Sequence, residues 1–199
     1  MVQDFIAAKD WGRDVRQGRM VALVGDAELD EGNVYEVLQE GGKNNLRNTW
    51  WIIDYNRQSL DGIVREGLFE RIEKIFAAFG WDVVRVKYGA LQRAAFEEPA
   101  ALMENLGGNC VETMADTFAA IDHDRPTCFL AYTIKGWGTP IAGHKDNHGG
   151  LMTKAQMAEW QAHMGVPVGQ EWDPFATVED VEGLKAFLAR VPFFAEGIR

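Results

Sequence analysis

The chain has 199 residues, of which 47% are apolar and 25% are charged, as in an ordinary soluble globular domain. Its net charge of −10 excludes nucleic acid and anionic membrane surfaces as partners, because both attract basic proteins. Two cysteines, Cys110 and Cys128, are too few for a disulfide framework, and no stretch is apolar enough to span a membrane. We therefore expect a cytoplasmic protein without a secretory signal.

The first third of the chain predicts a helix followed by a β-α-β unit. Apolar side chains at helical spacing predict a helix over Val2–Arg16. Two short apolar runs rich in Val, Ile and Trp, Val21–Gly25 and Thr49–Tyr55, predict strands. The segment between them places Val34 and Leu38 on one helix face. The two strands then run parallel, and both end at the same edge of a sheet.

Polar residues follow both predicted strands at that edge. Gly25-Asp26 follows the first strand, and Asn56-Arg57-Gln58 follows the second. A carboxylate, an amide oxygen and a backbone carbonyl are hard oxygen donors, the ligands that Mg²⁺ takes together with phosphate oxygens. These residues alone lead to the hypothesis of a site for Mg²⁺ and a diphosphate at the carboxyl edge of the sheet.

Other interpretations of the first motif compete with this one. A Gly-Asp pair after a strand is in most proteins a turn with an Asx hydrogen bond. The segment DAELDEG imitates part of a calcium loop, but Gly32 lies one position late and Val37 stands where that loop has its bidentate Glu. A dinucleotide-binding fold needs G-x-G-x-x-G, which does not follow Val21–Val24. The plain turn therefore stays open on this motif alone.

The segments GDAELDEG and DYNRQSLDG together resemble the thiamine diphosphate motif of the transketolase superfamily. That motif begins with Gly-Asp-Gly and ends near an Asn, and Asp26 and Asn56 are thirty residues apart here. A more specific resemblance is to the first, decarboxylating component of the homodimeric bacterial pyruvate dehydrogenase complex. The shared features are Asp30-Glu31, Gln58 two residues after the Asn, and Leu60-Asp61-Gly62.

The resemblance implies a metal site and a cofactor site in the same residues. Asp26 and Asn56 would ligate Mg²⁺ through their side chains, and Gln58 through its main-chain carbonyl. The cofactor contacts that it implies here are Gly25, Asp26, Ala27, Glu28 and Asn56. Ala27 stands where the general motif has glycine. Its methyl group would either crowd the diphosphate or require a turn without positive φ.

The middle of the chain continues the alternation of helices and strands. Glu66–Phe79 predicts a helix that stops at Gly80, and Trp81–Val86 predicts a third strand. Residues 90–122 predict two helices that are split at Gly107-Gly108, with Leu106 on the first. Thr127–Thr133 predicts a fourth strand. We therefore expect an α/β fold with three α/β/α layers and a mostly parallel sheet, the thiamine diphosphate-binding fold.

A third motif follows the fourth strand. Ile134-Lys135-Gly136-Trp137-Gly138 and a later His resemble the segment at the mouth of the cofactor site in the transketolase superfamily. The resemblance implies that Lys135 and His148 contact the cofactor and that His148 is catalytic. An imidazole that titrates near neutrality can donate to an oxyanion and move a proton. A zinc pair of His144 and His148, or plain surface histidines, are the alternatives.

The last part of the chain matches the superfamily less well. Thr153 predicts the N-cap of a helix that runs to Met164. We expect the diphosphate-binding domain to cover residues 1–165. Residues 166–199 would then form a C-terminal segment, with an extended linker over Val166–Trp172 and a short helix over Val178–Leu188.

The resemblance also implies what the chain does and what it needs. The expected function is the thiamine diphosphate- and Mg²⁺-binding domain of a pyruvate dehydrogenase-type 2-oxo acid decarboxylating enzyme, with a transketolase and a non-catalytic fragment as alternatives. The superfamily places an essential glutamate on a pyrimidine-binding domain, which these residues lack. We therefore expect that domain on another chain or on a missing part of the same protein, in a homodimer or heteromer. A lipoyl carrier protein is a further expected partner.

Overall fold

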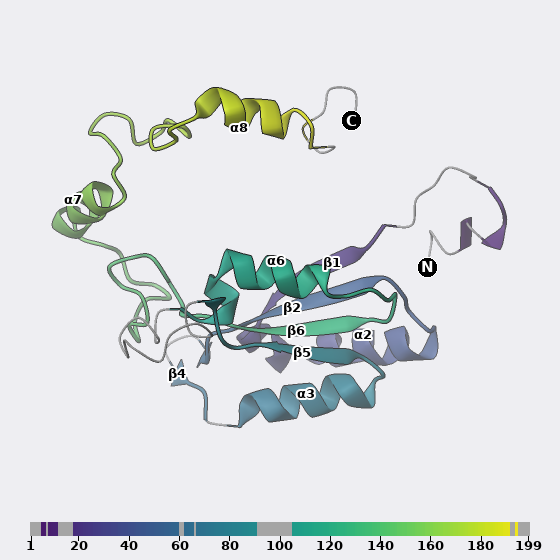
Figure 1. The fold of residues 1–199 in the computed structure, drawn as a ribbon. Coiled ribbons are helices and arrows are strands. Elements are labelled where there is room, and N and C mark those ends of the chain that lie inside the picture. The colour runs from purple at the N-terminus through teal and green to yellow at the C-terminus, as the bar shows by residue number, and fades with distance from the viewer. Residues whose placement is uncertain are drawn as a thin grey trace. The chain divides into compact units, whose positions relative to one another are not determined.

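The computed structural model describes residues 5–6, 8–11, 18–59, 62–65, 67–90, 105–191 and 194. Its centre is a sheet of four parallel strands in the order β1-β2-β6-β5. The strands are β1 (Met20–Gly25), β2 (Thr49–Tyr55), β5 (Asp82–Val86) and β6 (Thr127–Tyr132). All four point their carboxyl ends in one direction, so the residues that follow them gather at one edge (Figure 1).

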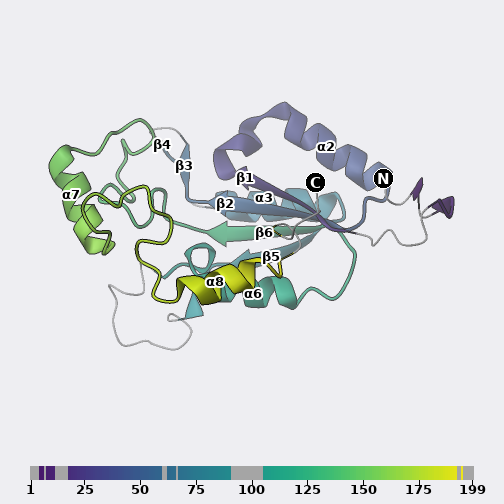
Figure 2. The same cartoon turned by 90° about the horizontal axis from the view of Figure 1, so that it is seen from above.

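Helices cover both faces of this sheet. The helices α2 (Gly32–Lys43) and α3 (Leu68–Ala78) lie on one face, and α6 (Val111–Ala119) lies on the other (Figures 1 and 2). The expected α/β fold with a mostly parallel sheet and three layers is thus confirmed. Each helix connects two parallel strands, the arrangement that a β-α-β chain requires.

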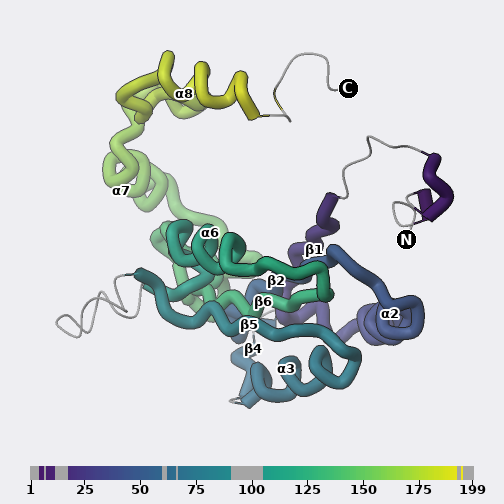
Figure 3. The backbone as a smooth tube through the Cα atoms, turned by 45° about the vertical axis from the view of Figure 1, so that its right-hand side comes forward, coloured from purple at the N-terminus to yellow at the C-terminus, as the bar shows by residue number. Residues whose placement is uncertain are grey.

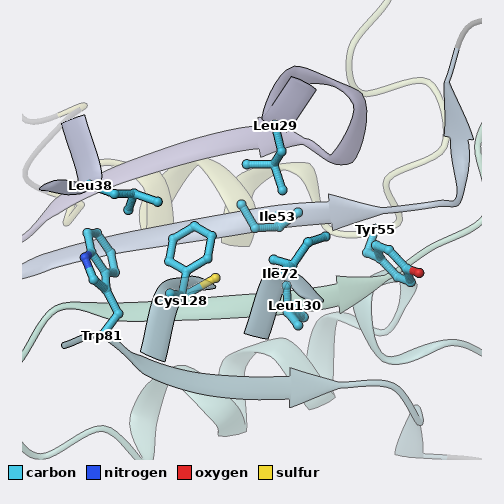
Figure 4. Packing of buried hydrophobic residues seen from close by; sticks show 9 residues of the cluster. Leu29, Leu38, Ile53, Tyr55, Ile72, Trp81, Cys128 and Leu130 are labelled. Carbon is cyan, nitrogen blue, oxygen red and sulfur yellow. The ribbon is translucent and has the colours of Figure 1, made fainter. Parts of the chain in front are cut away.

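Alternating side chains of the central strands form two separate clusters. Ile53 and Tyr55 of β2 pack on the α2 and α3 side with Cys128 and Leu130 of β6, together with further buried residues of both helices (Figure 4). On the α6 side, the Trp50 ring stacks on Phe118 at 5.3 Å and meets Phe129 edge-on at 5.0 Å. Because β2 and β6 are covered on both faces, they are continuous apolar runs rather than alternating ones.

Residues with special backbone conformations set the ends of several elements. The helix α3 ends before Gly80, whose φ of +80° is a conformation that glycine adopts without steric cost. Gly107 and Gly108 belong to the 3-10 helix η2 (Gly107–Asn109). A Cβ atom on Gly107 would lie 2.4 Å from the Val86 carbonyl oxygen, and one on Gly108 would lie 2.7 Å from that of Tyr132. This pair is glycine because η2 crosses the strand ends at backbone contact.

Several sequence-based boundaries differ from the structure. Leu106 forms a bridge with Tyr88, so the predicted helix does not reach it. Residues 166–172 contain turns in place of an extended linker. After β2 the chain adds a small hairpin of β3 (Gln58–Ser59) and β4 (Gly62–Ile63), which the sequence did not indicate. Most of the predicted helix Val2–Arg16, residues 91–104 and Leu60-Asp61 lie outside the described residues.

The chain divides into two compact units, Met1–Gly150 and Leu151–Arg199. The second unit contains the helices α7 (Lys154–His163) and α8 (Val181–Leu188), which follow one another along the chain in Figure 3. Neither helix has a buried residue. A boundary at residue 165 between a cofactor domain and a linker stays a prediction. No helix in the described part of the chain is both long and apolar enough to cross a membrane.

Candidate cofactor and metal site

The carboxyl ends of β1 and β2 bring the first two motifs together. Asp26 opens the 3-10 helix η1 (Asp26–Asp30) directly after β1, and its side chain is buried. The backbone N–H of Arg57 donates to Asp26 Oδ2 at 2.7 Å. Because Gly25 pairs with Asp54 in the sheet, this contact follows from the register of the two strands. Asp26 therefore lies against the turn that holds Asn56 and Gln58.

The turn from Asn56 to Gln58 has an unusual backbone. Asn56 Oδ1 accepts a hydrogen bond from the Gln58 N–H at 2.9 Å, which is an Asx turn. Arg57 has a φ of +63°, a left-handed conformation that a residue with a Cβ seldom adopts. The Arg57 N–H bond to Asp26 holds this conformation in place. Such strained positions gather at ligand-binding sites, where the surrounding contacts maintain them.

The environment of Asp26 makes its negative charge costly. Burial raises the pKa of the Asp26 carboxyl, and the nearby Asp54 charge raises it further, while hydrogen bonds from the Arg57, Ala27 and Asn56 backbone lower it. The net direction is upward, so the carboxylate is destabilised relative to an exposed one. A divalent cation beside Asp26 would reverse this, because an opposite charge favours the ionised form.

The residues of η1 adopt a turn that suits alanine. Ala27 is not among the described residues with positive φ, so it needs no glycine for its backbone. Of the two consequences foreseen for Ala27, the structure shows the turn without positive φ. Glu28 bends back, and its Oε2 accepts a hydrogen bond from the Gly25 N–H at 3.0 Å. The Gly25 N–H, the first backbone donor of this turn, is therefore already bound by the Glu28 carboxylate.

The third motif starts from the end of β6, next to β2. The Thr133 N–H donates to the Tyr55 carbonyl at 3.1 Å, and the Thr133 hydroxyl donates to Asp54 Oδ1. The following Ile134 N–H donates to Asn109 Oδ1 at 3.0 Å, which ties the motif to η2. These contacts anchor the start of the loop from residue 134 to residue 150 at the same sheet edge as Asp26.

Lys135 and His148 lie together within this loop. The distance from Lys135 Nζ to His148 Nδ1 is 3.3 Å. An ammonium group can only donate, so this contact is a hydrogen bond in the imidazole tautomer that leaves Nδ1 free to accept. Asn147 holds the loop by donating from Nδ2 to the Lys135 carbonyl at 2.9 Å. A half-buried lysine and an exposed imidazole are therefore paired in the loop of the third motif.

A direct contact joins this loop to the turn after β2. Gln58 Nε2 donates to the Gly143 carbonyl at 3.3 Å. The structure therefore brings residues of all three motifs to one edge: Gly25, Asp26, Ala27, Glu28, Asn56, Gln58, Lys135 and His148. His144 lies in the same loop, but its Nδ1 accepts from the Asp146 N–H at 3.2 Å.

Metal sites built from His, Cys, Asp or Glu alone do not fit this edge. Across the described ranges, no group of three or more such side chains could hold a metal ion. The zinc alternative for His144 and His148 therefore lacks further ligands there. A set of one carboxylate, one amide oxygen and one backbone carbonyl is a different type of site. It suits Mg²⁺, which keeps several waters and takes phosphate oxygens.

Sequence reasoning missed several residues that shape the site. The apolar pattern treats Asp54 and Thr133 only as strand residues, and no motif of the sequence singles out Asn109 or Asn147. The polar Asp54 within an otherwise apolar strand was the one available signal. The others act through contacts between segments far apart in the chain, which no local pattern shows.

Comparisons with known proteins identify the family. The family described as transketolase, thiamine diphosphate binding domain, matches residues 2–186. The chain is 30% identical to transketolase 2 of Xanthobacter flavus over 176 residues, covering 87% of this chain and 22% of that protein. It is 31% identical to the pyruvate dehydrogenase E1 component of Corynebacterium glutamicum over 179 residues, covering 63% of this chain and 19% of the relative. The chain belongs to the transketolase family of thiamine diphosphate-binding domains.

Two further matches describe its fold and extent. The chain is 27% identical to one of the subunits of apulose-4-phosphate transketolase from Phocaeicola vulgatus over 154 residues, covering 76% of this chain and 43% of that protein. The transketolase structure from Campylobacter jejuni superimposes with a TM-score of 0.59 and 22% identity, over 80% of this chain and 23% of that one. The chain thus spans less than half the length of each of these relatives. The resemblance to the superfamily and the assignment of thiamine diphosphate as cofactor are confirmed at the level of the family.

Proposed function

We propose that this chain is the thiamine diphosphate- and Mg²⁺-binding domain of a pyruvate dehydrogenase-type enzyme that decarboxylates a 2-oxo acid. The observation that carries the proposal is the contact between Asp26 and the turn after β2. It puts the carboxylate beside Asn56 and Gln58 at the carboxyl edge of a parallel sheet, where open α/β folds bind ligands. Asp26, Asn56 and the Gln58 carbonyl would hold the metal.

The remaining site residues fit the anionic end of this cofactor. Gly25, Ala27 and Glu28 lie in the turn beside Asp26. Lys135 supplies a positive charge. An N–H group of His148 can donate a hydrogen bond to a diphosphate or substrate oxygen, and the imidazole can transfer a proton to the substrate. When bound, thiamine diphosphate would supply a nucleophilic ring carbon and an electron sink for the carbonyl substrate. His148 is the residue we assign to catalysis.

The proposed function requires a partner domain. The relative from Phocaeicola vulgatus is named as one subunit of its enzyme. In the two longer relatives, the region that matches this chain makes up only 22% and 19% of the protein. We propose that a pyrimidine-binding domain completes the site in a homodimer or heteromer, and that a lipoyl carrier accepts the acyl group. The described cysteines are free thiols, in keeping with a cytoplasmic site of action. Without the partner we expect weak cofactor binding and little or no turnover.

Transfer of two-carbon ketol units between sugar phosphates is the second candidate. It is favoured by the transketolase relatives and by the likeness to transketolase structures. The Asn56-x-Gln58 pattern and Leu60-Asp61-Gly62 favour the dehydrogenase instead. Reconstitution with a pyrimidine-binding chain, followed by parallel assays of pyruvate decarboxylation and of ketol transfer from a ketose phosphate, separates the two. Activity in neither assay would leave a non-catalytic role in an assembly.

Replacement of Asp26 tests the metal assignment directly. Asp26→Asn removes the one formal charge of the ligand set, so Mg²⁺-dependent binding of thiamine diphosphate should weaken by about tenfold or more. Isothermal titration at fixed Mg²⁺ measures the affinity. Glu36→Gln, an exposed change in α2, is the matched loss of one negative charge and should have no effect. Equal affinities for Asp26→Asn and wild type would show that the metal ligand has been misplaced.

A further inference from the structure

Asp54 lies between two of the proposed site segments and accepts a hydrogen bond from each. It is the next to last residue of β2 and half-buried. Its Oδ1 accepts from the hydroxyl of Thr133, and its Oδ2 accepts from Asn56 Nδ2 at 3.5 Å. Thr133 is 79 residues further along the chain and directly precedes the third motif. A single carboxylate therefore joins the turn after β2 to the start of the loop that carries Lys135.

This contact decides which way the Asn56 amide faces. An amide has an oxygen that accepts and an NH₂ group that donates, whereas a carboxylate can only accept. Asp54 therefore selects the orientation with the NH₂ group of Asn56 toward itself. The Gln58 N–H, which can only donate, meets Asn56 Oδ1 from the other side at 2.9 Å. Both neighbours demand the same orientation, and it directs the oxygen toward the turn beside Asp26.

The consequence for a metal ligand is direct. A reversed Asn56 amide would present NH₂ hydrogens to a cation, which cannot coordinate it. Groups that orient a metal ligand by hydrogen bonding commonly contribute tenfold to a hundredfold to metal affinity. Thr133 completes the arrangement, because its hydroxyl occupies the other carboxylate oxygen and limits rotation of the Asp54 side chain.

We propose that Asp54 is a positioning residue that fixes Asn56 as an oxygen ligand, and that Thr133 fixes Asp54 in turn. This inference rests on the proposed function, since it concerns the same metal site. It adds a link between motifs: the third motif bears on metal affinity through Thr133 without touching the metal. Asp54 contacts neither the metal nor the cofactor in this arrangement.

The test measures Mg²⁺ affinity by calorimetry at fixed thiamine diphosphate. Asp54→Asn replaces one of the two accepting oxygens by an NH₂ group, so Asn56 and Thr133 can no longer both donate to this side chain, and Mg²⁺ binding should weaken by about tenfold to a hundredfold. Thr133→Val removes the hydroxyl at similar volume and should weaken binding by a smaller factor. Thr133→Ser keeps the hydroxyl and should bind as the wild type does. Melting temperatures of all variants separate loss of the fold from loss of orientation.

An exchange of the two side chains gives the most specific outcome. In the double variant Asp54→Asn with Asn56→Asp, the carboxylate at position 56 offers oxygens on both sides, and the amide at position 54 can donate to it. Mg²⁺ affinity should recover toward wild type, which a purely structural role of Asp54 does not predict.

The outcomes separate the two proposals. If the wild-type protein binds Mg²⁺ and cofactor but Asp54→Asn binds them equally well, the role of Asp54 is overturned and the proposed function stands. If the wild type binds neither Mg²⁺ nor cofactor, alone or with a pyrimidine-binding partner, the proposed function is wrong. The proposed role of Asp54 is then wrong as well, because it depends on the same metal site. If Asp54→Asn does not fold, equal affinities for Thr133→Val and Thr133→Ser overturn the link through Thr133.

Discussion

The two units of this chain differ in how they are stabilised. In the unit Met1–Gly150, two clusters of buried side chains fill both faces of the sheet. In the unit Leu151–Arg199, neither helix buries a residue, and Leu151, Val168 and Trp172 are 93%, 91% and 96% exposed. The site residues are all on the first unit. The packed sheet therefore carries the candidate site, while the second unit presents apolar side chains that are exposed within the described chain.

The largest expected effect concerns the two thiols of the sheet unit. Cys128 lies in the core, and burial raises the pKa of its thiol, so a thiol reagent should reach it only when the unit unfolds. Its labelling rate should be lower than that of an unfolded thiol by a factor equal to the equilibrium constant between folded and unfolded protein. For domains this constant corresponds to a free energy of unfolding of about 5–15 kcal/mol. Cys110 is partly exposed and should react in the folded protein.

The pH dependence of labelling distinguishes the two cysteines further. Hydrogen bonds from the Ala90 N–H and from Thr113 lower the pKa of Cys110. A lowered pKa leaves more thiolate at a given pH, so labelling of Cys110 should persist to lower pH than labelling of a cysteine peptide. Stopped-flow measurements across pH provide both rates. Fast labelling of Cys128 at neutral pH would contradict a closed core.

Matched phenylalanine deletions compare the two units directly. Phe76 of α3 is 1% exposed and packs on Trp51 and Trp81, so Phe76→Ala should lower the free energy of unfolding by about 3–5 kcal/mol. Phe187 of α8 is 55% exposed, and Phe187→Ala should change the free energy of unfolding by no more than about 0.5 kcal/mol. Denaturant titrations measure both values. Similar losses for the two variants would show that α8 is buried in solution.

An effect smaller than that of Phe76→Ala is expected at the start of α7 in the second unit. Thr153 Oγ1 accepts a hydrogen bond from the Gln156 N–H at 3.2 Å and caps α7. Thr153→Ala should destabilise this helix by about 1 kcal/mol, and Thr153→Ser should retain most of the cap. Hydrogen exchange should accelerate in α7 and stay unchanged in β2 and β6. Faster exchange in the strands as well would mean that the two units unfold together.

The sequence predicted most of the sheet unit because its signals are local. The apolar run Thr49–Tyr55 is the observed β2, and Thr153 caps its helix as expected. The meeting of Asp26 with the turn at Asn56 also follows from sequence, since parallel strands end at one edge. The parallel direction of the two strands and their pairing as neighbours are needed to place these residues together.

What the sequence could not show depends on contacts between distant segments. The hydrogen bond from Thr133 to Asp54 requires that β6 pair with β2, and four strands allow several orders. The sequence marks the glycines at 107 and 108 as a break between helices, whereas the structure shows that the backbone at the ends of β5 and β6 leaves no room for a side chain there. Apolar spacing assigns Leu106 to a helix, because spacing alone cannot distinguish a helix from a segment that forms a β-bridge.

The strand order also determines when the site can form. β6 is the last of the described strands along the chain, yet it inserts between β2 and β5, which precede it. During synthesis, β1 and β2 can bring Asp26 and Asn56 together early, but Thr133 and the Lys135 loop arrive only after residue 127 has left the ribosome. Closing the long loop between β2 and β6 is a costly folding step. The nascent chain therefore holds an incomplete candidate site until β6 enters the sheet.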